Sequence, residues 1–202
     1  EFRVDGISRL FAVLTAVVWL LVGIYSITYM THERDEHRFF GFYLIVLGVL
    51  IGLDFSANLV TMYVFYELMT LTSLPLVLHE LTKDAVMAGL KYLFYSVAGA
   101  FLALFGILFL ASFSGTLAFT PGGVLGGVSL AGKEGILLAA VCCMLLGFGT
   151  KAGMFPMHGW LPTAHPVAPA PASAVLSGLI TKSGVLAVIR VVYYIVGPEL
   201  LR

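Results

Sequence analysis

The fold is decided by residues 149–184, GTKAGMFPMHGWLPTAHPVAPAPASAVLSGLITKSG, which separate two long apolar runs. This stretch contains two lysines, two histidines and five prolines. Charge is expensive inside a bilayer and proline breaks a regular helix, so these residue types are unusual between membrane-like sequences. The stretch therefore indicates an interrupted membrane helix with ionisable side chains close to the interruption.

The composition of the whole chain is that of an integral membrane protein. Of its 202 residues, 60% are hydrophobic and 11% are charged, and the mean hydropathy is +1.02. An ordinary soluble domain has about 25% charged residues. The formal net charge is zero, so nothing indicates a nucleic-acid partner or a basic helix on a membrane surface. Cys142 and Cys143 are neighbours in an apolar run and predict no disulfide, metal site or redox centre.

Apolar runs of about 20 residues predict membrane-spanning helices along the whole chain. The runs lack the alternation of a membrane β-barrel, so we expect one all-α membrane domain over residues 1–202. Basic residues flank the spans on both sides, which leaves the orientation in the membrane open. Six spans are expected, the fifth of them broken: 10–30, 39–57, 59–79, 85–111, 136–160 and 172–196.

Of the ionisable residues in these spans, the candidates selected are Glu67, Lys91, Lys151, Lys182 and Arg190. Such residues normally face a protein interior or a hydrated cavity, and they mark ion pathways. The structural alternative is that they extend to the membrane surface or form static ion pairs that fix helix packing. Lys91, near the start of its span, fits this alternative best, and the same interpretation is open for Arg190, about two turns beyond Lys182.

The prolines exclude a regular helix from about 156 to 171, with Pro156 and Pro162 as the expected helix breaks. Irregular backbone at membrane depth is tolerated where it is buried in protein or lines water. Such a break would bring His158 and His165 near Lys151. The sequence leaves open an ordinary proline-rich loop outside the membrane, with two solvated histidines.

A carboxylate, two lysines and a histidine have the chemistry of a proton relay. A carboxylate beside a lysine favours the protonated lysine, and separation of the two favours proton release. Histidine exchanges its proton near neutral pH. An ammonium group does not coordinate sodium, so lysines favour protons as the transported ion.

Four motifs carry a resemblance to a known family: DGISRLF at 5–11, NLVTMYVFYELMTLTSLPLV at 58–77, KYLFYSVAGA at 91–100, and residues 151–190. They resemble the proton-translocating antiporter-type subunits. This family comprises antiporter-like subunits of respiratory complex I, large subunits of multisubunit cation/proton antiporters, and relatives in membrane-bound hydrogenases. Its members have about fourteen membrane helices with two inverted repeats. The chain resembles the first repeat plus one preceding helix, so we expect a part of a longer or split subunit.

The resemblance also implies roles for individual residues. It places the family's glutamate on Glu67, the lysine of its broken helix on Lys151, its linking histidine on His165, and the lysine of the next helix on Lys182. In this scheme Glu67 modulates Lys151, and His165 passes the proton toward Lys182. The accessory candidates are Lys91, His158 and Arg190.

The expected function is proton translocation, or exchange of protons for sodium, in a larger complex driven by redox chemistry or by an ion gradient. The chain would be a non-catalytic subunit of an assembly such as NADH:quinone oxidoreductase or membrane-bound hydrogenase, in a prokaryotic energy-coupling plasma membrane. Its expected partners are other membrane subunits and lipid. No cofactor is expected, because the glycines of 123–132 follow no strand and open no dinucleotide-binding unit. A structural membrane scaffold and a substrate-specific secondary transporter are the alternatives.

Overall fold

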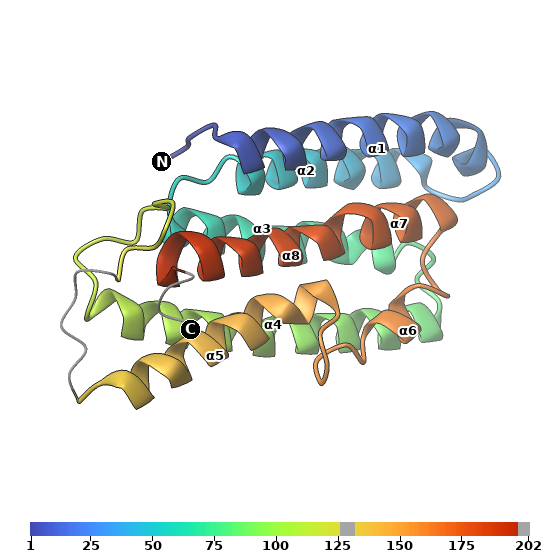
Figure 1. Ribbon diagram of the computed structural model, residues 1–202. Coiled ribbons are helices and arrows are strands. Elements are labelled where there is room, and N and C mark those ends of the chain that lie inside the picture. The colour runs from blue at the N-terminus through green and yellow to red at the C-terminus, as the bar shows by residue number, and fades with distance from the viewer. Residues whose placement is uncertain (126–131, 198–202) are drawn as a thin grey trace.

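The computed structural model describes residues 1–125 and 132–197, which form an all-helical bundle (Figure 1). Within these residues, six helices are long and apolar enough to cross a membrane. The predicted fold class is therefore confirmed. Part of the predicted glycine-rich linker, 126–131, lies outside the described residues. The helices that precede the interruption are α1 Gly6–Met30, α2 Glu36–Asp54, α3 Leu59–Val77, α4 Lys83–Ala111 and α5 Glu134–Ala152.

The last span is assembled from four consecutive helical pieces between Ala170 and Val196. Two of them are π-helical, each with one wide turn, and such turns occur often at functional sites. A separate single turn, α6 Leu161–Ala164, precedes this span. The four pieces are α7 Ala170–Val175, the π-helix η1 Leu176–Ile180, α8 Thr181–Arg190 and the π-helix η2 Val191–Val196.

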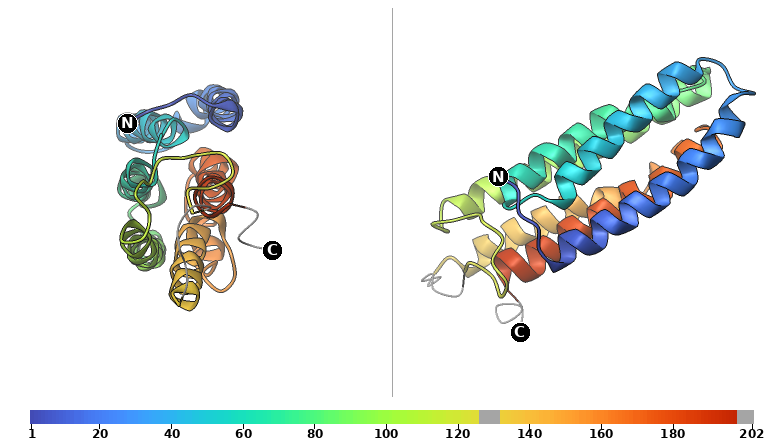
Figure 2. Two further views of the ribbon diagram at one scale, coloured as in Figure 1. Left: turned by 60° about the vertical axis from the view of Figure 1, so that its left-hand side comes forward. Right: turned by 90° about the horizontal axis from the view of Figure 1, so that it is seen from above.

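The six spans lie in two layers of three (Figure 2). One layer contains α2, α3 and α4, and the other contains α1, the α7–α8 span and α5. The end of the bundle that holds the N-terminus is called the proximal end here. The opposite, distal end holds the connections 31–35 and 78–82, which join α1 to α2 and α3 to α4.

Side-chain caps explain where several helices begin. Asp5 accepts a hydrogen bond from the backbone N–H of Ser8 at 2.9 Å and starts α1. Asn58 caps α3 through the N–H of Thr61 at 2.7 Å. These short polar side chains satisfy backbone donors that the first helical turn leaves unpaired. They therefore fix the helix starts within otherwise apolar sequence.

The interruption starts earlier than the prolines predicted. Gly153, in the left-handed conformation at φ +76°, ends α5 directly after Ala152, before Pro156 and well short of the predicted limit at residue 160. Figure 1 shows α5 ending part-way along the bundle, with 153–169 continuing beside α4 to the distal end. Glycine pays no steric penalty at positive φ, which makes it a common helix stop.

Two prolines predicted to prevent helix formation lie inside helices. Pro162 falls in the first turn of α6, and Pro171 falls in the first turn of α7, so the irregular region is shorter than 156–171. A proline in the first turn of a helix has no intrahelical hydrogen bond to lose, because the N–H there is unpaired in any case. The last span accordingly begins at Ala170 rather than at the predicted residue 172.

Two glycines bring the elements around the interruption into close contact. A Cβ atom on Gly147 of α5 would lie 2.5 Å from the backbone of α4 at Ala103. A Cβ atom on Gly184 of α8 would lie 2.5 Å from the backbone nitrogen of Ala152. Small residues at such crossings let membrane helices pack backbone to backbone. The C-terminal turn of α5 is thereby held tightly between α4 and α8.

Candidate functional site

Lys151 lies in the last turn of α5 and is fully buried. Its amino group donates a hydrogen bond to the hydroxyl of Tyr92 on α4, with Nζ and the hydroxyl oxygen 2.5 Å apart. The same nitrogen lies 4.1 Å from the centre of the Tyr92 ring. A buried lysine without such contacts would be costly, and an aromatic face together with a hydroxyl partly replaces its hydration.

Tyr92 extends this contact to a third helix. Its hydroxyl lies 2.7 Å from the Oγ of Ser73 on α3, and Ser73 in turn donates to the carbonyl of Met69 at 2.6 Å. Tyr92 and Ser73 are both fully buried. A hydrogen-bonded chain therefore runs from Lys151 on α5 through α4 to α3.

The carbonyl groups at the end of α5 find partners in side chains. Tyr66 of α3 donates to the carbonyls of Gly147 and Phe148 at 3.0 and 3.3 Å. The indole N–H of Trp160 donates to the carbonyl of Thr150 at 2.9 Å. Tyr66 and Trp160 thus add side-chain hydrogen bonds to carbonyl groups in the last turns of α5, beside Lys151.

Trp160 lies close both to Tyr92, the partner of Lys151, and to the histidine of the interruption. Its ring lies 4.9 Å from that of Tyr92 and 6.5 Å from that of His165, centre to centre. No hydrogen bond joins Lys151 to His165 among the residues that the structure describes. Transfer of a proton between the two would need a water molecule or a side-chain movement.

Glu67 is half-buried on α3 and does not touch Lys151. Its Oε1 atom is buried and has no hydrogen-bond partner within the described residues. Only two ion pairs form in ranges 1–125 and 132–197, and neither includes Glu67 or Lys151. The direct contact that the relay hypothesis invokes is therefore absent from this conformation.

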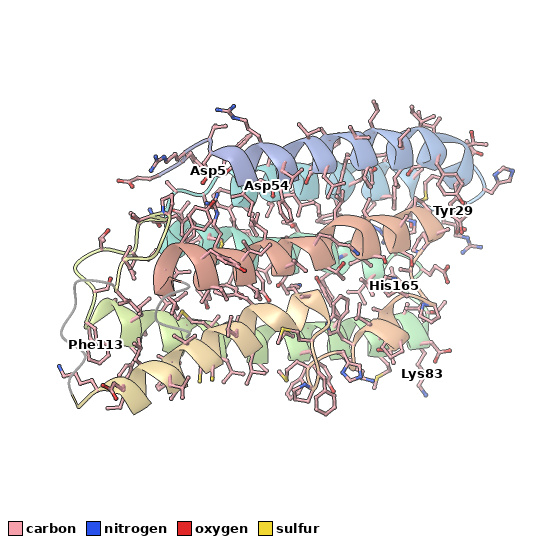
Figure 3. All side chains as sticks on the ribbon, in the orientation of Figure 1. Asp5, Tyr29, Asp54, Lys83, Phe113 and His165 are labelled. Carbon is pink, nitrogen blue, oxygen red and sulfur yellow. The ribbon has the colours of Figure 1, made fainter. Side chains whose placement is uncertain are left out.

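His165 and Lys182 border a second polar cluster, on the outer surface of the last span. His165 Nδ1 lies 2.8 Å from Ser173 Oγ, and Lys182 Nζ donates to the carbonyl of Ser177 at 2.7 Å. A pocket of about 650 Å³ includes His165, Ser173, Ser177 and Tyr29 in its walls. Figure 3 shows His165 and Tyr29 toward the distal end. Lys182 itself is exposed.

The accessory candidates lie apart from Lys151. Lys91 is half-buried on α4 and borders a groove shared with Pro162 and Pro166 of the interruption. His158 is exposed, with its ring 5.9 Å from that of Phe155. Neither side chain joins the hydrogen-bonded chain around Lys151.

Arg190 is almost fully buried, with 2% of its surface exposed, at the proximal end. It forms a two-pronged ion pair with Asp5, at 2.5 and 3.0 Å, and its guanidinium lies over the rings of Phe119 and Tyr194. Two parallel N–H···O bonds and two aromatic faces hold a guanidinium firmly. Arg190 thus connects the start of α1 to the last span, which is a packing role.

The family profile described as "NADH:quinone oxidoreductase/Mrp antiporter, TM" matches residues 56–200, more than half of the chain. The chain belongs to this family. A second profile, "NADH-Ubiquinone oxidoreductase (complex I), chain 5 N-terminus", matches residues 1–40. The family match covers both hydrogen-bonded clusters described above.

Individual relatives agree with this assignment. Hydrogenase-4 component B of Escherichia coli is 34% identical over 94% of the chain, and one of the Na(+)/H(+) antiporter subunits of Bacillus subtilis is 32% identical over 93%. The chain spans 28% and 38% of the length of these two relatives. It therefore corresponds to less than half of either protein.

Two solved membrane complexes contain chains with the same fold. A chain of the archaeal membrane-bound sulfane sulfur reductase matches with a TM-score of 0.82 at 22% identity, over 92% of this chain and 37% of that one. A chain of respiratory complex I from Thermus thermophilus matches with a TM-score of 0.77 at 23% identity, over 97% and 41%. The bundle is that of the antiporter-like subunits.

Sequence reasoning missed several residues of this antiporter-family bundle. Tyr92 and Trp160 carry no charge and lie in aromatic-rich sequence, so nothing marked them as partners of Lys151. Asp54, 2% exposed at the end of α2, accepts a hydrogen bond from Thr15 at 3.0 Å (Figure 3). An acidic residue directly after an apolar run is a visible signal, and the sequence prediction did not include it among the ionisable candidates.

Proposed function

We propose that the chain is part of a proton-translocating subunit and that Lys151 is the group that takes up and releases the proton. The observation that carries this proposal is the burial of Lys151, beside the interruption of α5, without a carboxylate partner in the part of the chain that the structure describes. An intramembrane ionisable residue of this kind is a functional-site candidate on physical grounds. The family membership favours the same function.

The contrast between Lys151 and Arg190 separates a functional charge from a structural one. Arg190 has a carboxylate partner and two aromatic faces, which is how a protein holds a permanent cation. Lys151 has one hydroxyl and one ring, both neutral. A lysine can lose its proton in such surroundings, whereas arginine stays protonated. A scaffold role accounts for Arg190 and leaves the arrangement of Lys151 unexplained.

Glu67 acts in this proposal through its charge rather than by contact. Its buried, unpaired oxygen on α3 leaves it free to alter the electrostatic potential at Lys151 as the helices move. When the carboxylate approaches, the protonated lysine is favoured, and when it withdraws, proton release is favoured. His165 and Lys182 form the neighbouring cluster of the path, and the ring of Trp160 lies close to Tyr92 of the first cluster and to His165 of the second.

The ion and the assembly follow from the same chemistry. Ammonium and imidazole groups exchange protons and do not coordinate sodium, so the proposed ion for this half of the path is H⁺. The matched relatives are named as a hydrogenase component and an antiporter subunit. We accordingly infer a place among other membrane subunits of a multisubunit complex in a prokaryotic energy-coupling membrane.

Proton uptake into sealed vesicles that contain the complete complex tests the proposal. Lys151→Ala is expected to abolish uptake while the subunit remains assembled at normal abundance. Lys133→Ala is the matched control, because this lysine is exposed directly before the start of the same helix, α5. Normal uptake in Lys151→Ala would overturn the proposal, and loss of assembly in that variant alone would favour the scaffold.

A further inference from the structure

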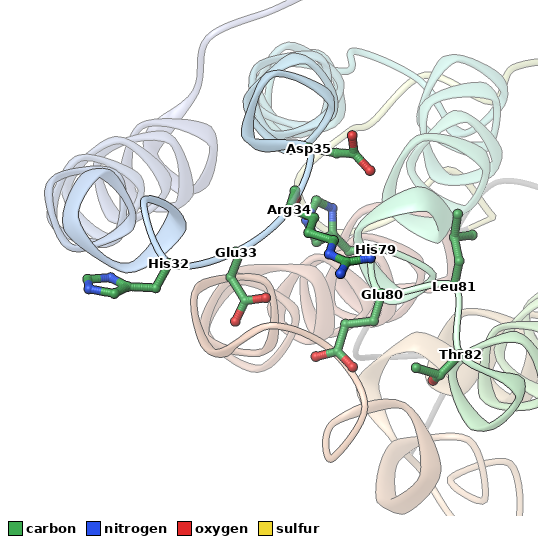
Figure 4. Close-up of a pocket in the computed structure, with 8 residues that line it drawn as sticks. All are labelled: His32, Glu33, Arg34, Asp35, His79, Glu80, Leu81 and Thr82. Carbon is green, nitrogen blue, oxygen red and sulfur yellow. Dashed lines mark hydrogen bonds between the residues drawn. The ribbon is translucent and has the colours of Figure 1, made fainter.

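A polar pocket of about 600 Å³ opens at the distal end, between two connections of the bundle (Figure 4). One wall comes from the α1–α2 connection and the other from the segment between α3 and α4. The charged side chains around it are three carboxylates and one guanidinium, so its electrostatic potential favours cations. The residues of the pocket are His32, Glu33, Arg34, Asp35, His79, Glu80, Leu81 and Thr82.

His79 fixes the shape of this pocket. It is only 4% exposed, and its Nε2 atom lies 2.8 Å from the carbonyl oxygen of Arg34. A carbonyl oxygen can only accept, so Nε2 carries the hydrogen and the lone pair of the neutral ring is on Nδ1. The guanidinium of Arg38 donates to the carbonyl of His79. These bonds join the segment between α3 and α4 to the α1–α2 connection and to α2.

The Nδ1 atom of His79 is buried and has no hydrogen-bond partner within the described residues. Nearly all buried polar atoms in proteins have a partner, so this unpaired nitrogen is an exception at the edge of the pocket. The described residues contain no group of three or more His, Cys, Asp or Glu arranged to hold a metal ion. The chemistry of the pocket therefore suits water and protons better than a divalent cation.

Glu80 belongs to the walls of two pockets. It borders the distal pocket beside His79, and it also borders the pocket that contains His165 and Ser177. Its side chain is exposed. No other residue is shared by the walls of these two pockets. Glu80 thus stands where the aqueous surface of the distal end meets the cluster of His165 and Lys182.

We propose that Glu80 is the proton-collecting residue at the mouth of the path that leads to His165 and Lys182. A hydronium ion or a buffer acid transfers its proton to the carboxylate of Glu80. The resulting carboxyl group passes the proton to the imidazole of His165 through the pocket that both residues border, and the carboxylate of Glu80 is restored. No other bond forms or breaks, and no electron is transferred. This inference rests on the proposed proton-translocating function.

The charged groups around Glu80 determine the electrostatic potential there, and with it the local concentration of protons. Glu33 and Asp35 face the same pocket from the α1–α2 connection and add negative charge. Arg34 and His32 come from the same connection, and Arg38 of α2 is engaged with the carbonyl of His79. Carboxylates on a water-exposed surface exchange protons with solvent faster than the half-buried imidazole of His165 can. Glu33 and Asp35 therefore supply Glu80, which is the one carboxylate of the three that also borders the pocket of His165.

Glu80→Gln tests this proposal in the complete complex, reconstituted in sealed vesicles at equal subunit abundance. Glu36→Gln is the matched control, because Glu36 lies at the same end and borders neither pocket. The variant Glu80→Gln is expected to slow proton uptake several-fold, with Glu36→Gln unchanged. A small diffusible buffer such as imidazole should restore the rate of Glu80→Gln, because it delivers protons directly to His165 in its pocket.

The outcomes separate this inference from the proposed function. Equal uptake in Glu80→Gln and Glu36→Gln would overturn the role of Glu80, even if Lys151→Ala is inactive. Slow uptake that no buffer restores would also overturn it, because a purely structural defect is insensitive to mobile proton carriers. Normal uptake in Lys151→Ala, measured in the same preparation, would instead refute the proposed function itself.

Discussion

Lys151 donates a hydrogen bond to Tyr92 and lies over the face of the same ring, with Nζ 4.1 Å from the ring centre. The two residues come from different helices, α5 and α4, which pack backbone to backbone through Gly147. One neutral side chain thus provides both the hydrogen-bond acceptor and the aromatic face for a buried amino group. This arrangement can accommodate a charged or a neutral lysine.

Tyr92→Phe removes the hydroxyl and keeps the ring. Lys151 then loses the only hydrogen-bond partner that the structure gives it, and Ser73 loses one of its contacts. We expect slower proton uptake with the complex still assembled, and a loss of stability of about 1–3 kcal/mol for the unpaired buried groups. Uptake in vesicles and thermal unfolding of the solubilised complex measure the two effects. Wild-type uptake in Tyr92→Phe would show that the hydroxyl plays no part.

Glu67→Gln removes the charge of the half-buried glutamate and keeps its shape. Because Glu67 makes no ion pair within the described residues, its loss should leave assembly unaffected. Proton uptake should fall, since the proposed electrostatic control of Lys151 is lost. A scaffold role predicts the reverse pattern. Reduced subunit abundance with normal uptake per assembled complex would therefore count against the proposal.

Asp5→Asn breaks the ion pair with Arg190. The guanidinium is 2% exposed and would lose its counter-charge, so we expect a loss of about 3 kcal/mol of stability. Asp35→Asn is the matched control, because its pair with Arg38 spans 3.9 Å and Asp35 is 65% exposed. A change below about 1 kcal/mol is expected there. Equal unfolding temperatures for the two variants would contradict this prediction.

The stabilising effect of Asp5 should also depend on pH. Burial by itself raises the pKa of this carboxyl, but hydrogen bonds from Arg190 and Ser8 outweigh it and lower the pKa to about 2, from an ordinary 3.8. A lowered pKa means that the contribution is complete above the ordinary value and is lost as the pH falls through about 2. The stability difference between wild type and Asp5→Asn should therefore stay constant at neutral pH and start to shrink only below about pH 4.

Gly147→Ala places a methyl group against the backbone of α4. The nearest atoms, the nitrogen of Ala103 and the carbonyl oxygen of Gly99, would each be 2.5 Å away. Backbone cannot rotate aside as a side chain can, so we expect a loss of about 1–3 kcal/mol and a displaced Lys151. Gly48→Ala is the control, because a Cβ there meets open space. A Gly147→Ala complex as stable as the control would show that the two helices separate easily.

Much of the fold could be predicted because a membrane helix can be recognised from the composition of its own sequence. Runs such as 10–30 and 85–111 are long, apolar and almost free of charge, and a bilayer permits few other structures for them. The interruption was predicted from the prolines, but its start was not. Gly153 ends α5 through its backbone conformation, and a glycine gives no such signal in a chain that has 22 of them.

The site was predictable only where charge marks it. Lys151 was identified because a charged side chain in an apolar run is energetically costly and normally faces a protein interior. Its burial agrees with that reasoning. Its neighbours depend on how α3, α4 and α5 are rotated about their axes, which composition does not determine. Tyr92 was therefore missed. The partner of Arg190 was missed for a related reason, because Asp5 lies 185 positions away and the two meet only in the folded bundle.

The central claim is that Lys151 releases its proton during each transport cycle, and Lys151→Arg tests it most directly. Arginine retains the positive charge on a somewhat longer side chain, but it does not lose its proton in proteins. The account predicts that vesicles with the Lys151→Arg complex, at wild-type subunit abundance, take up no protons. Uptake at the wild-type rate would contradict it, because a fixed positive charge at residue 151 would then be sufficient.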